Sequence, residues 1–389
     1  MPGHRLELAD VFRTHQRDFL DRWNSVLSSE QRRALRNLRD CRTVALGGHL
    51  QQCDRCGHRV ILYNSCRNRH CPKCQASARA KWLAQRQAEL LPVPYFHVVF
   101  TLSQELAHLA LQNPKQIYNL LFRAASESLL TIAADPQHLG ASIGFLAVLH
   151  TWGQNLHLHP HLHCVVPGGG ISPDGSRWIT CRKNFFLPVR VLSRLFRKKF
   201  LKALRSAFRR DELRFAGDLR YLAAPPAFQS LCQKLAPREW VVYAKPPFGG
   251  PQRVLKYLAR YTHRVAISNH RLRSLENGNV SFAWKDYAHG NQTKDMTLDA
   301  VEFIRRFLIH VLPSGFVRIR QFGLLANRVR KQKLDQCRAL LAAPQPLTAW
   351  QDSPEVKTDD PHRCPVCALG RLIVIELLIA QPIPAQDTS

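Results

Sequence analysis

The chain has 389 residues, in which Lys and Arg number 56 against 28 Asp and Glu, so its formal net charge is +28. This length allows two or three compact units, and an apolar content of 45% excludes a disordered chain. The positive excess favours nucleic acid as the partner over a ribosomal or membrane surface.

Neither end of the sequence predicts a membrane segment. The beginning, MPGHRLELADVF, has no apolar signal core, so we expect a cytoplasmic protein. The most apolar late stretch, Leu372 to Ala380, is interrupted by Glu376 and is much shorter than the roughly 20 residues of a membrane helix. Cysteines stay reduced in the cytoplasm, which favours metal ligation over disulfides.

The predicted elements change character at Tyr95. Before it, apolar spacing predicts helix over 10–40, a Cys/His-rich segment fills 41–75, and strong helix formers predict helix over 76–91. After it, strands are expected at 95–102, 144–151, 161–166, 219–223, 240–244, 265–269 and 280–287, and helices at 114–134, 189–210 and 297–311. Strands that alternate with helices indicate an α/β or α+β domain whose helices pack on a sheet.

Two Cys-x-x-Cys knuckles stand close together in the Cys/His-rich segment, and four thiolates could close one tetrahedral zinc site. The four belong to Cys53, Cys56, Cys71 and Cys74. Further ligands for a second site are Cys66 and His70, with Cys41, His49 or His58 upstream. We therefore expect one or two structural zinc ions that fold a small module.

Arginines are interspersed with these cysteines, as at Arg67 and Arg69. They leave little apolar surface to bury cysteines that lack a metal. We expect both arginines to contact DNA, because a guanidinium matches the geometry of a phosphate.

A third knuckle, formed by Cys364 and Cys367, stands alone near the end of the chain. It could be half of a zinc site completed by His362 or by a distant ligand, but an isolated pair is weak evidence. The surrounding segment, from about residue 340, is rich in Pro, Ala and Asp and predicts a linker and a poorly ordered tail.

Four histidines occur at alternate positions in WGQNLHLHPHLHCVVPGGG. Side chains alternate between the faces of a strand, so His161 and His163 point to the same side. Pro160 interrupts the ladder before them, which favours this pair over His157 and His159. Two imidazoles on a rigid sheet can hold one cation and leave positions open for water or substrate oxygens.

Two tyrosines lie one helical turn apart in GGPQRVLKYLARYTHRVAISNHR. Pro251 suits a first helical position, so Tyr257 and Tyr261 share one face. Basic residues border that face, and we expect them to contact DNA: Arg253, Lys256, Arg260 and Arg264. By spacing alone, such a pair is more often packed in a core than used in catalysis.

Three motifs together resemble one family. His-Leu-His at 161–163 resembles the HUH motif of rolling-circle nucleases, and its setting, HPHLHCVVPGG, resembles transposases of insertion-sequence family ninety-one. SCRNRHCPKCQ resembles the zinc-binding domain of that family, and YLARYTHR resembles its two-tyrosine motif. The match continues through HVLPSGFVRIRQFGLLANR, so it covers roughly residues 40–335 in the expected order.

The resemblance implies an α+β fold: an HUH endonuclease-like antiparallel sheet with packed helices, preceded by a small Cys-rich zinc-binding module. The expected domains are 1–91 for zinc and DNA recognition, 92–340 for catalysis and 341–389 for the tail. HUH enzymes usually supply a third polar metal ligand, for which Gln154 is the candidate, with His157 or His159 as substitutes.

The implied activity is rolling-circle-like transposition in the bacterial cytoplasm, in association with the nucleoid. Tyr257 and Tyr261 would nick and rejoin single-stranded DNA through a 5′-phosphotyrosine, with Mg²⁺ or Mn²⁺ at the histidines and without a nucleotide cofactor. Two alternatives remain open: a rolling-circle replication initiator or relaxase with the same chemistry, and a zinc-dependent DNA-binding protein without catalysis.

Overall fold

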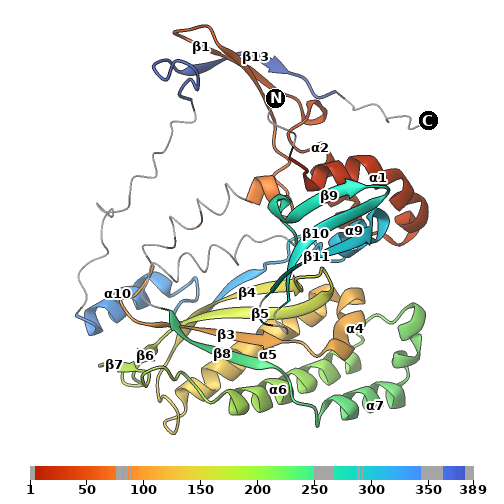
Figure 1. Ribbon diagram of the computed structural model, residues 1–389. Helices are drawn as coiled ribbons and strands as arrows, with labels where there is room; N and C mark the ends of the chain where they lie inside the picture. Colours follow the sequence, from red (N-terminus) through yellow and green to blue (C-terminus); the bar gives the residue numbers. More distant parts are fainter. Residues whose placement is uncertain are drawn as a thin grey trace. The chain divides into compact units, whose positions relative to one another are not determined.

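The computed structural model describes residues 5–75, 82, 86, 89–248, 266–286, 290, 292–342 and 362–381. The chain forms two compact units (Figure 1). Unit 1 comprises Met1–Ala78, Ile267–Leu308 and Leu347–Ser389, and unit 2 comprises Arg79–Ala266 and Ile309–Pro346. These boundaries differ from the three consecutive segments that the sequence predicts, because each unit is assembled from separate stretches of chain.

Unit 2 is built on a five-stranded sheet in the order β12-β4-β5-β3-β8, and every neighbouring pair in it is antiparallel. Its strands are β3 (Tyr95–Thr101), β4 (Gly144–Trp152), β5 (Leu158–Pro167), β8 (Val242–Phe248) and β12 (Ile319–Gly323). A short pair, β6 (Gly169–Ile171) and β7 (Trp178–Thr180), follows β5. The expected α+β class is confirmed.

Helices cover one face of this sheet (Figure 1). They are α4 (Ala107–Gln112), α5 (Pro114–Ala134), α6 (Val189–Arg209) and α7 (Pro225–Leu235). In α6 the apolar residues Leu192, Phe196 and Phe200 recur at helical spacing and are buried. Each such side chain contributes about 1.5–3 kcal/mol when it leaves water, so the stripe fastens α6 to the sheet.

The side chains of β5 alternate between two environments. Leu162 and Cys164 belong to the core beneath the helices, whereas Val165 packs on the opposite face of the sheet. That face is covered in part by α10 (Arg330–Leu340), which buries Leu334 there. His161 and His163 share the parity of Val165, so they lie on this second face, as the sequence predicts.

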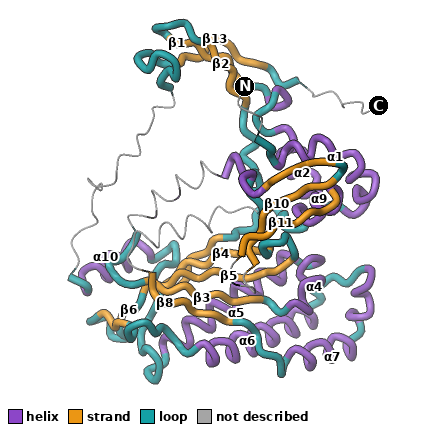
Figure 2. Tube along the Cα trace, viewed as in Figure 1, coloured by secondary structure: helices purple, strands orange, loops and turns teal. Residues whose placement is uncertain are grey.

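Unit 1 contains two strand groups, which are visible in Figure 2. Strands β9 (Leu272–Glu276), β10 (Asn279–Asp286) and β11 (Gln292–Asp299) form one sheet. The unit also contains the helices α1 (Leu8–Trp23), α2 (Ser29–Asp40) and α9 (Ala300–Leu308). Phe12 meets Phe307 edge to face, with ring centroids 5.5 Å apart. Strands β1 (Gly48–Cys53), β2 (Arg59–Tyr63) and β13 (Leu372–Leu378) form the other sheet.

Several expected elements need correction. The single helix over 10–40 is two helices, because a 3₁₀ turn at Asn24–Val26 intervenes and Ser28 caps α2 in a capping box with Gln31. The expected strand at 219–223 is the 3₁₀ helix Gly217–Ala223. The described residues of 265–269 form no strand: bends at 266–267 precede the 3₁₀ helix Asn269–Arg271.

The end of the chain is the largest correction. Part of the expected disordered tail forms β13, which pairs antiparallel with β1 from Gly48↔Leu378 to Cys53↔Leu372. Backbone hydrogen bonding to a strand more than 300 positions earlier cannot be read from local composition. Within the described residues, no helix combines the length and apolar character needed to cross a membrane.

Candidate metal centres and nucleic-acid surface

Three histidines from two adjacent strands converge on the second face of the unit 2 sheet. The register of β4 and β5 places His150 directly opposite His161, and Val148 opposite His163. One ring nitrogen from each of His150, His161 and His163 lies within 4.8 Å of the others. The expected pair is therefore brought together, and His150 joins it.

Hydrogen bonds to the other ring nitrogens orient two of these imidazoles. His161 Nδ1 lies 2.6 Å from the carbonyl oxygen of His159. A carbonyl only accepts, so His161 carries its proton on Nδ1 and presents Nε2 as a lone pair. His163 Nδ1 lies 2.8 Å from His97 Nε2. Donation from His163 in this contact leaves its Nε2 as a second lone pair.

The Nε2 atoms of His161 and His163 face one another at 3.0 Å. Two ligands about 2.1 Å from one ion and at right angles to each other are separated by about 3.0 Å, so the spacing fits adjacent positions of an octahedral cation. A cation held by both nitrogens requires the proton of His163 to be on Nδ1, where His97 can accept it. Three protein ligands leave other positions open for water or substrate oxygens.

His97, on β3, lies behind His163 rather than in the histidine group. Its ring stacks on that of His163 with centroids 5.0 Å apart, and only 3% of the residue is exposed. Burial lowers the pKa of His97 to about 3, and the positive charge of Lys245 adds to the effect. His97 is therefore neutral at ordinary pH and able to accept a proton from His163.

The predicted third ligand, Gln154, lies in the turn between β4 and β5. Its role as a metal ligand stays a prediction. The substitutes named with it are not part of the histidine group: the ring of His157 contacts Asn155, and His159 contributes its backbone carbonyl to His161. His150 was not among the predicted residues, although it alternates with Leu146 and Val148, which pack on the second face of the sheet.

The predicted nucleophiles lie outside the described residues. Tyr257 and Tyr261 both fall there, as do the basic residues expected beside them: Arg253, Lys256, Arg260 and Arg264. Their roles remain predictions.

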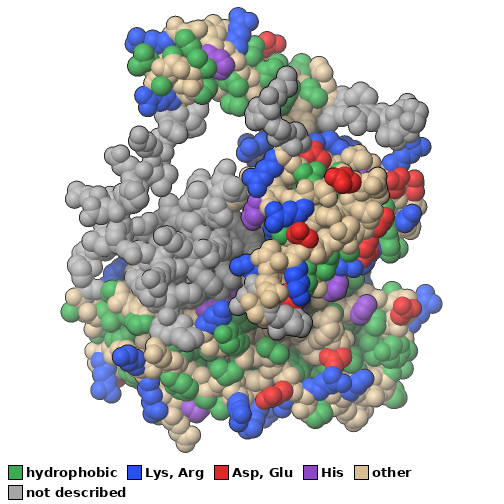
Figure 3. Space-filling view, viewed as in Figure 1, with side chains coloured by type: hydrophobic (Ala, Val, Ile, Leu, Met, Phe, Trp, Pro, Cys, Tyr) green, Lys and Arg blue, Asp and Glu red, His purple; other side chains and the backbone are tan. Residues whose placement is uncertain are grey.

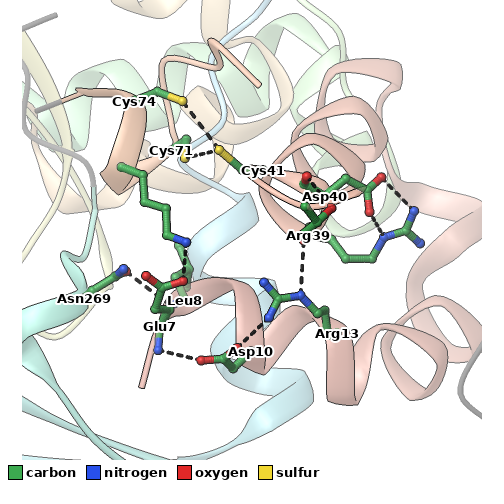
Figure 4. Close-up of polar contacts among 12 residues, drawn as sticks. Glu7, Leu8, Asp10, Arg13, Arg39, Asp40, Cys41, Cys71, Cys74 and Asn269 are labelled. Carbon is green, nitrogen blue, oxygen red and sulfur yellow. Dashed lines mark hydrogen bonds and ion pairs between the residues drawn. The ribbon is translucent and has the colours of Figure 1, made fainter. Parts of the chain in front are cut away.

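Unit 1 carries a first group of four thiols, and Figure 4 shows three of them next to the start of α1. The group consists of Cys41, Cys66, Cys71 and Cys74. Cys41 ends α2, and its Sγ lies 3.6 Å from the Sγ atoms of both Cys71 and Cys74. Four sulfurs about 2.3 Å from one tetrahedral ion are separated by about 3.8 Å, so the spacing fits zinc.

A second group of four thiols joins the two ends of the chain. It consists of Cys53, Cys56, Cys364 and Cys367. Cys53 Sγ lies 3.7 Å from Cys367 Sγ, and Cys56 Sγ lies 3.6 Å from Cys364 Sγ. The Gly370 amide donates to Cys367 Sγ at 3.4 Å, and backbone amides lower the pKa of Cys367 to about 6.

The expected set of four ligands, Cys53 and Cys56 with Cys71 and Cys74, is therefore wrong: the two knuckles belong to different groups. The knuckle of Cys53 and Cys56 forms the turn between β1 and β2, whereas Cys71 and Cys74 lie in a different group. His70, a predicted ligand, precedes Cys71 in the sequence and is buried, but it belongs to neither group. Spacing identifies knuckles but not which knuckles meet, because that depends on the path of the chain between them.

Two arginines predicted to contact DNA, Arg67 and Arg69, lie between Cys66 and Cys71 in the sequence. Arg67 is exposed next to Cys66, and its backbone is in the left-handed region with a φ of 50°. Arg69 is half-buried, and burial together with Arg33 lowers its pKa. Figure 3 shows Lys and Arg recurring over the visible face of the protein. Close positive charges of this kind favour a polyanion that neutralises them.

Comparison with known proteins identifies relatives that are described as transposases. Residues 144–333 match the profile of a family described as "Putative transposase", and residues 11–102 match one described as "Transposase zinc-binding domain". The chain is 55% identical over 393 residues to "Putative transposase y4qJ" of Sinorhizobium fredii, with 98% of each chain covered. It is 30% identical over 344 residues to the transposase for insertion sequence element IS801 of Pseudomonas savastanoi pv. phaseolicola, covering 84% of this chain and 79% of the relative. No solved structure matches.

Proposed function

Because the chain belongs to the IS91 family of transposases, we propose that it nicks and rejoins single-stranded DNA during rolling-circle-like transposition. One observation carries this proposal: the Nε2 atoms of His161 and His163 face each other at 3.0 Å on a sheet, with His150 beside them. Such a site has the open positions that phosphate chemistry needs.

His150, His161 and His163 would hold a divalent cation, which when bound supplies positive charge next to a non-bridging oxygen of the scissile phosphate. Imidazole is a softer ligand than the oxygens that Mg²⁺ prefers, so this donor set favours Mn²⁺ over Mg²⁺. Gln154 stays a candidate for a further ligand. His97 acts as a positioning residue, since accepting the Nδ1 proton of His163 holds that ring in its binding tautomer.

The proposed nucleophile is the phenol oxygen of Tyr257 or Tyr261. It attacks phosphorus and loses its proton, the bond from phosphorus to the bridging oxygen breaks, and that oxygen leaves as a 3′-hydroxyl after taking up a proton. The protein is then joined to the 5′ end. The free 3′-hydroxyl of another strand reverses the step without a nucleotide cofactor, because the phosphodiester energy is conserved.

Two tyrosines allow a second cleavage while the first strand is still held, as strand transfer requires. A phenol has a pKa near 10, so positive neighbours help to form the phenolate. Lys256, Arg260 and Arg264 are proposed for this role. With Arg67, Arg69 and Arg253 they would also contact the DNA of the element ends and target.

Covalent capture tests the nucleophiles. A labelled single-stranded oligonucleotide carrying an element end is incubated with the protein and Mn²⁺, and adducts are separated on a denaturing gel. Tyr257→Phe with Tyr261→Phe should abolish adducts while DNA binding persists, and Tyr221→Phe, at an exposed tyrosine of unit 2, is the matched control. Adducts in the double variant would show that another residue is the nucleophile.

A replication initiator with the same chemistry would cut a supercoiled origin and would not integrate the product. A DNA-binding regulator would form no adduct at all. The IS91-family match favours the transposase over the replication initiator, and the histidine site favours an enzyme over a regulator without catalysis.

A further inference from the structure

We propose that Cys53, Cys56, Cys364 and Cys367 bind a second structural zinc ion, which fastens the end of the chain to its N-terminal hairpin. The matched family profiles end at residues 102 and 333, so neither includes Cys364 or Cys367. The site is distinct from the first thiol group, and it does not depend on the proposed strand-transfer chemistry.

The two halves of the site have the same local fold. In the first knuckle the Gly57 amide donates to the carbonyl of Cys53, and the amide of Cys56 donates to Cys53 Sγ at 3.5 Å. In the second, the Ala368 amide donates to the carbonyl of Cys364. Both turns use a left-handed residue, with φ of 70° at Gly57 and 54° at Ala368. Two matching knuckles present four sulfurs to one point.

The distances between the halves suit a metal and not disulfides. The contacts that cross from one knuckle to the other are 3.7 Å for Cys53 with Cys367 and 3.6 Å for Cys56 with Cys364. A disulfide needs about 2.05 Å between sulfurs, and a tetrahedral zinc thiolate site needs about 3.8 Å. All four cysteines are free.

The backbone around the site is closely fitted. The Arg371 amide donates to Asp54 Oδ1 at 2.8 Å, and the Asp54 amide donates to the carbonyl of Arg371 at 3.0 Å. A Cβ on Gly370 would lie 2.4 Å from Cys53 Sγ, so this position needs glycine. The knuckles are therefore docked by backbone contacts as well as by their sulfurs.

The sheet that continues from the knuckles has little core of its own. Along β13 only Leu372 is buried, while Val374 is 52% exposed and Leu377 is 78% exposed. Apolar burial therefore contributes little to holding β13 on β1. Cys56 and Cys364 are 308 residues apart, so a local interaction must offset the entropy lost when these distant segments are held together. Zinc binding supplies it, and we infer that β13 stays paired only while the metal is bound.

Cobalt substitution of the full-length chain tests the grouping, because thiolate-to-cobalt charge-transfer absorption counts Co–S bonds and ignores a histidine site. Cys364→Ala with Cys367→Ala should halve that absorption per chain. Cys41→Ala with Cys71→Ala should halve it as well. The matched control is Cys181→Ala with Cys337→Ala, two cysteines outside both groups, and it should leave the absorption unchanged.

The grouping suggested by sequence spacing alone predicts a different cobalt absorption for these variants. If Cys53 and Cys56 shared an ion with Cys71 and Cys74, the Cys364 and Cys367 variant would keep the full absorption, and the proposal would be overturned. Hydrogen exchange gives a second readout: amides of Leu372–Leu378 should lose protection in that variant and on zinc chelation. Unchanged protection would refute the fastening role.

A site shared between two copies of the chain must also be distinguished. A Cys53→Ala, Cys56→Ala variant mixed with a Cys364→Ala, Cys367→Ala variant should not regain the missing absorption. Recovery on mixing would show that the knuckles come from different chains. Loss of DNA adducts with normal cobalt spectra would count against the proposed function and leave the second zinc site standing.

Discussion

The histidine group of unit 2 and the thiol groups of unit 1 differ in the structure that surrounds them. The histidines come from adjacent strands of a five-stranded sheet that already has a large apolar core beneath it. The thiols come from knuckles and helix ends, and beside Cys53 and Cys364 the buried apolar cluster is small. In unit 2 the fold builds the site, whereas in unit 1 the site helps to build the fold.

Coordination explains this difference. Four thiolates fill a tetrahedral ion, so the thiol groups have no position left for a substrate. Three neutral imidazoles leave positions open and leave the charge of the ion uncompensated, which suits a phosphate ligand. Removing a ligand should therefore unfold structure in unit 1 and abolish chemistry in unit 2. The following variants test that contrast.

The largest effect is expected for Cys71→Ala. It removes one of four ligands from a site whose zinc is worth about 10–16 kcal/mol in small zinc modules, so the surrounding part of unit 1 should unfold. Circular dichroism and DNA binding should both decline, while Mn²⁺ binding at the histidines is retained. Cys181→Ala is the control. A normally folded Cys71 variant that had lost only cleavage would contradict the contrast.

His161→Ala should leave the protein folded and lower the nicking rate by about 1,000-fold or more, because several kcal/mol of charge stabilisation at the phosphate are lost. Single-turnover cleavage in saturating Mn²⁺ measures the effect, and thermal unfolding checks the fold. The exposed His108 provides the control His108→Ala. Equal rates in the two variants would exclude the histidine group as the catalytic centre.

Acid should weaken unit 2 through His310, which is 2% exposed and hydrogen-bonded to Thr151 Oγ1 and to the carbonyl of Leu156. Burial lowers its pKa to about 4, below the unfolded value near 6.5, so the unfolded chain takes up the proton first. Stability is complete above pH 6.5 and falls as the pH drops toward 4, by about 2 kcal/mol at pH 5.

Denaturant unfolding at pH 7 and pH 5 measures this loss, and His310→Gln should show a smaller change between the two pH values. Glutamine keeps one donor and one acceptor but does not titrate. The same pH dependence in the variant would assign the acid sensitivity to other groups.

The smallest effect is expected at His97, which touches a proposed ligand and not the ion. His97→Leu should weaken Mn²⁺ binding by about 10–100-fold, because the tautomer of His163 is no longer fixed. His97→Gln offers an oxygen acceptor and should recover part of the affinity. Calorimetric titration with Mn²⁺ measures both. If leucine and glutamine were equally impaired, packing and not the hydrogen bond would be the reason.

Local sequence patterns were sufficient to predict the ligands that lie close together in the chain, but not the ligands that join them from elsewhere. The alternation of His161 and His163 placed both rings on one face, since a strand has a period of two whatever lies beside it. The Cys-x-x-Cys spacing identified each knuckle because both of its ligands lie in a single local turn, whatever the rest of the chain does. The family resemblance, through these motifs and YLARYTHR, is confirmed by the matched transposases.

The partners of those halves were decided only by the tertiary structure. His150 faces His161 because of the register between β4 and β5, and His97 reaches His163 from β3. Cys53 and Cys56 meet Cys364 and Cys367 because β13 pairs with β1. Register and strand order depend on how the whole chain packs, so periodicity within one segment carries no information about them.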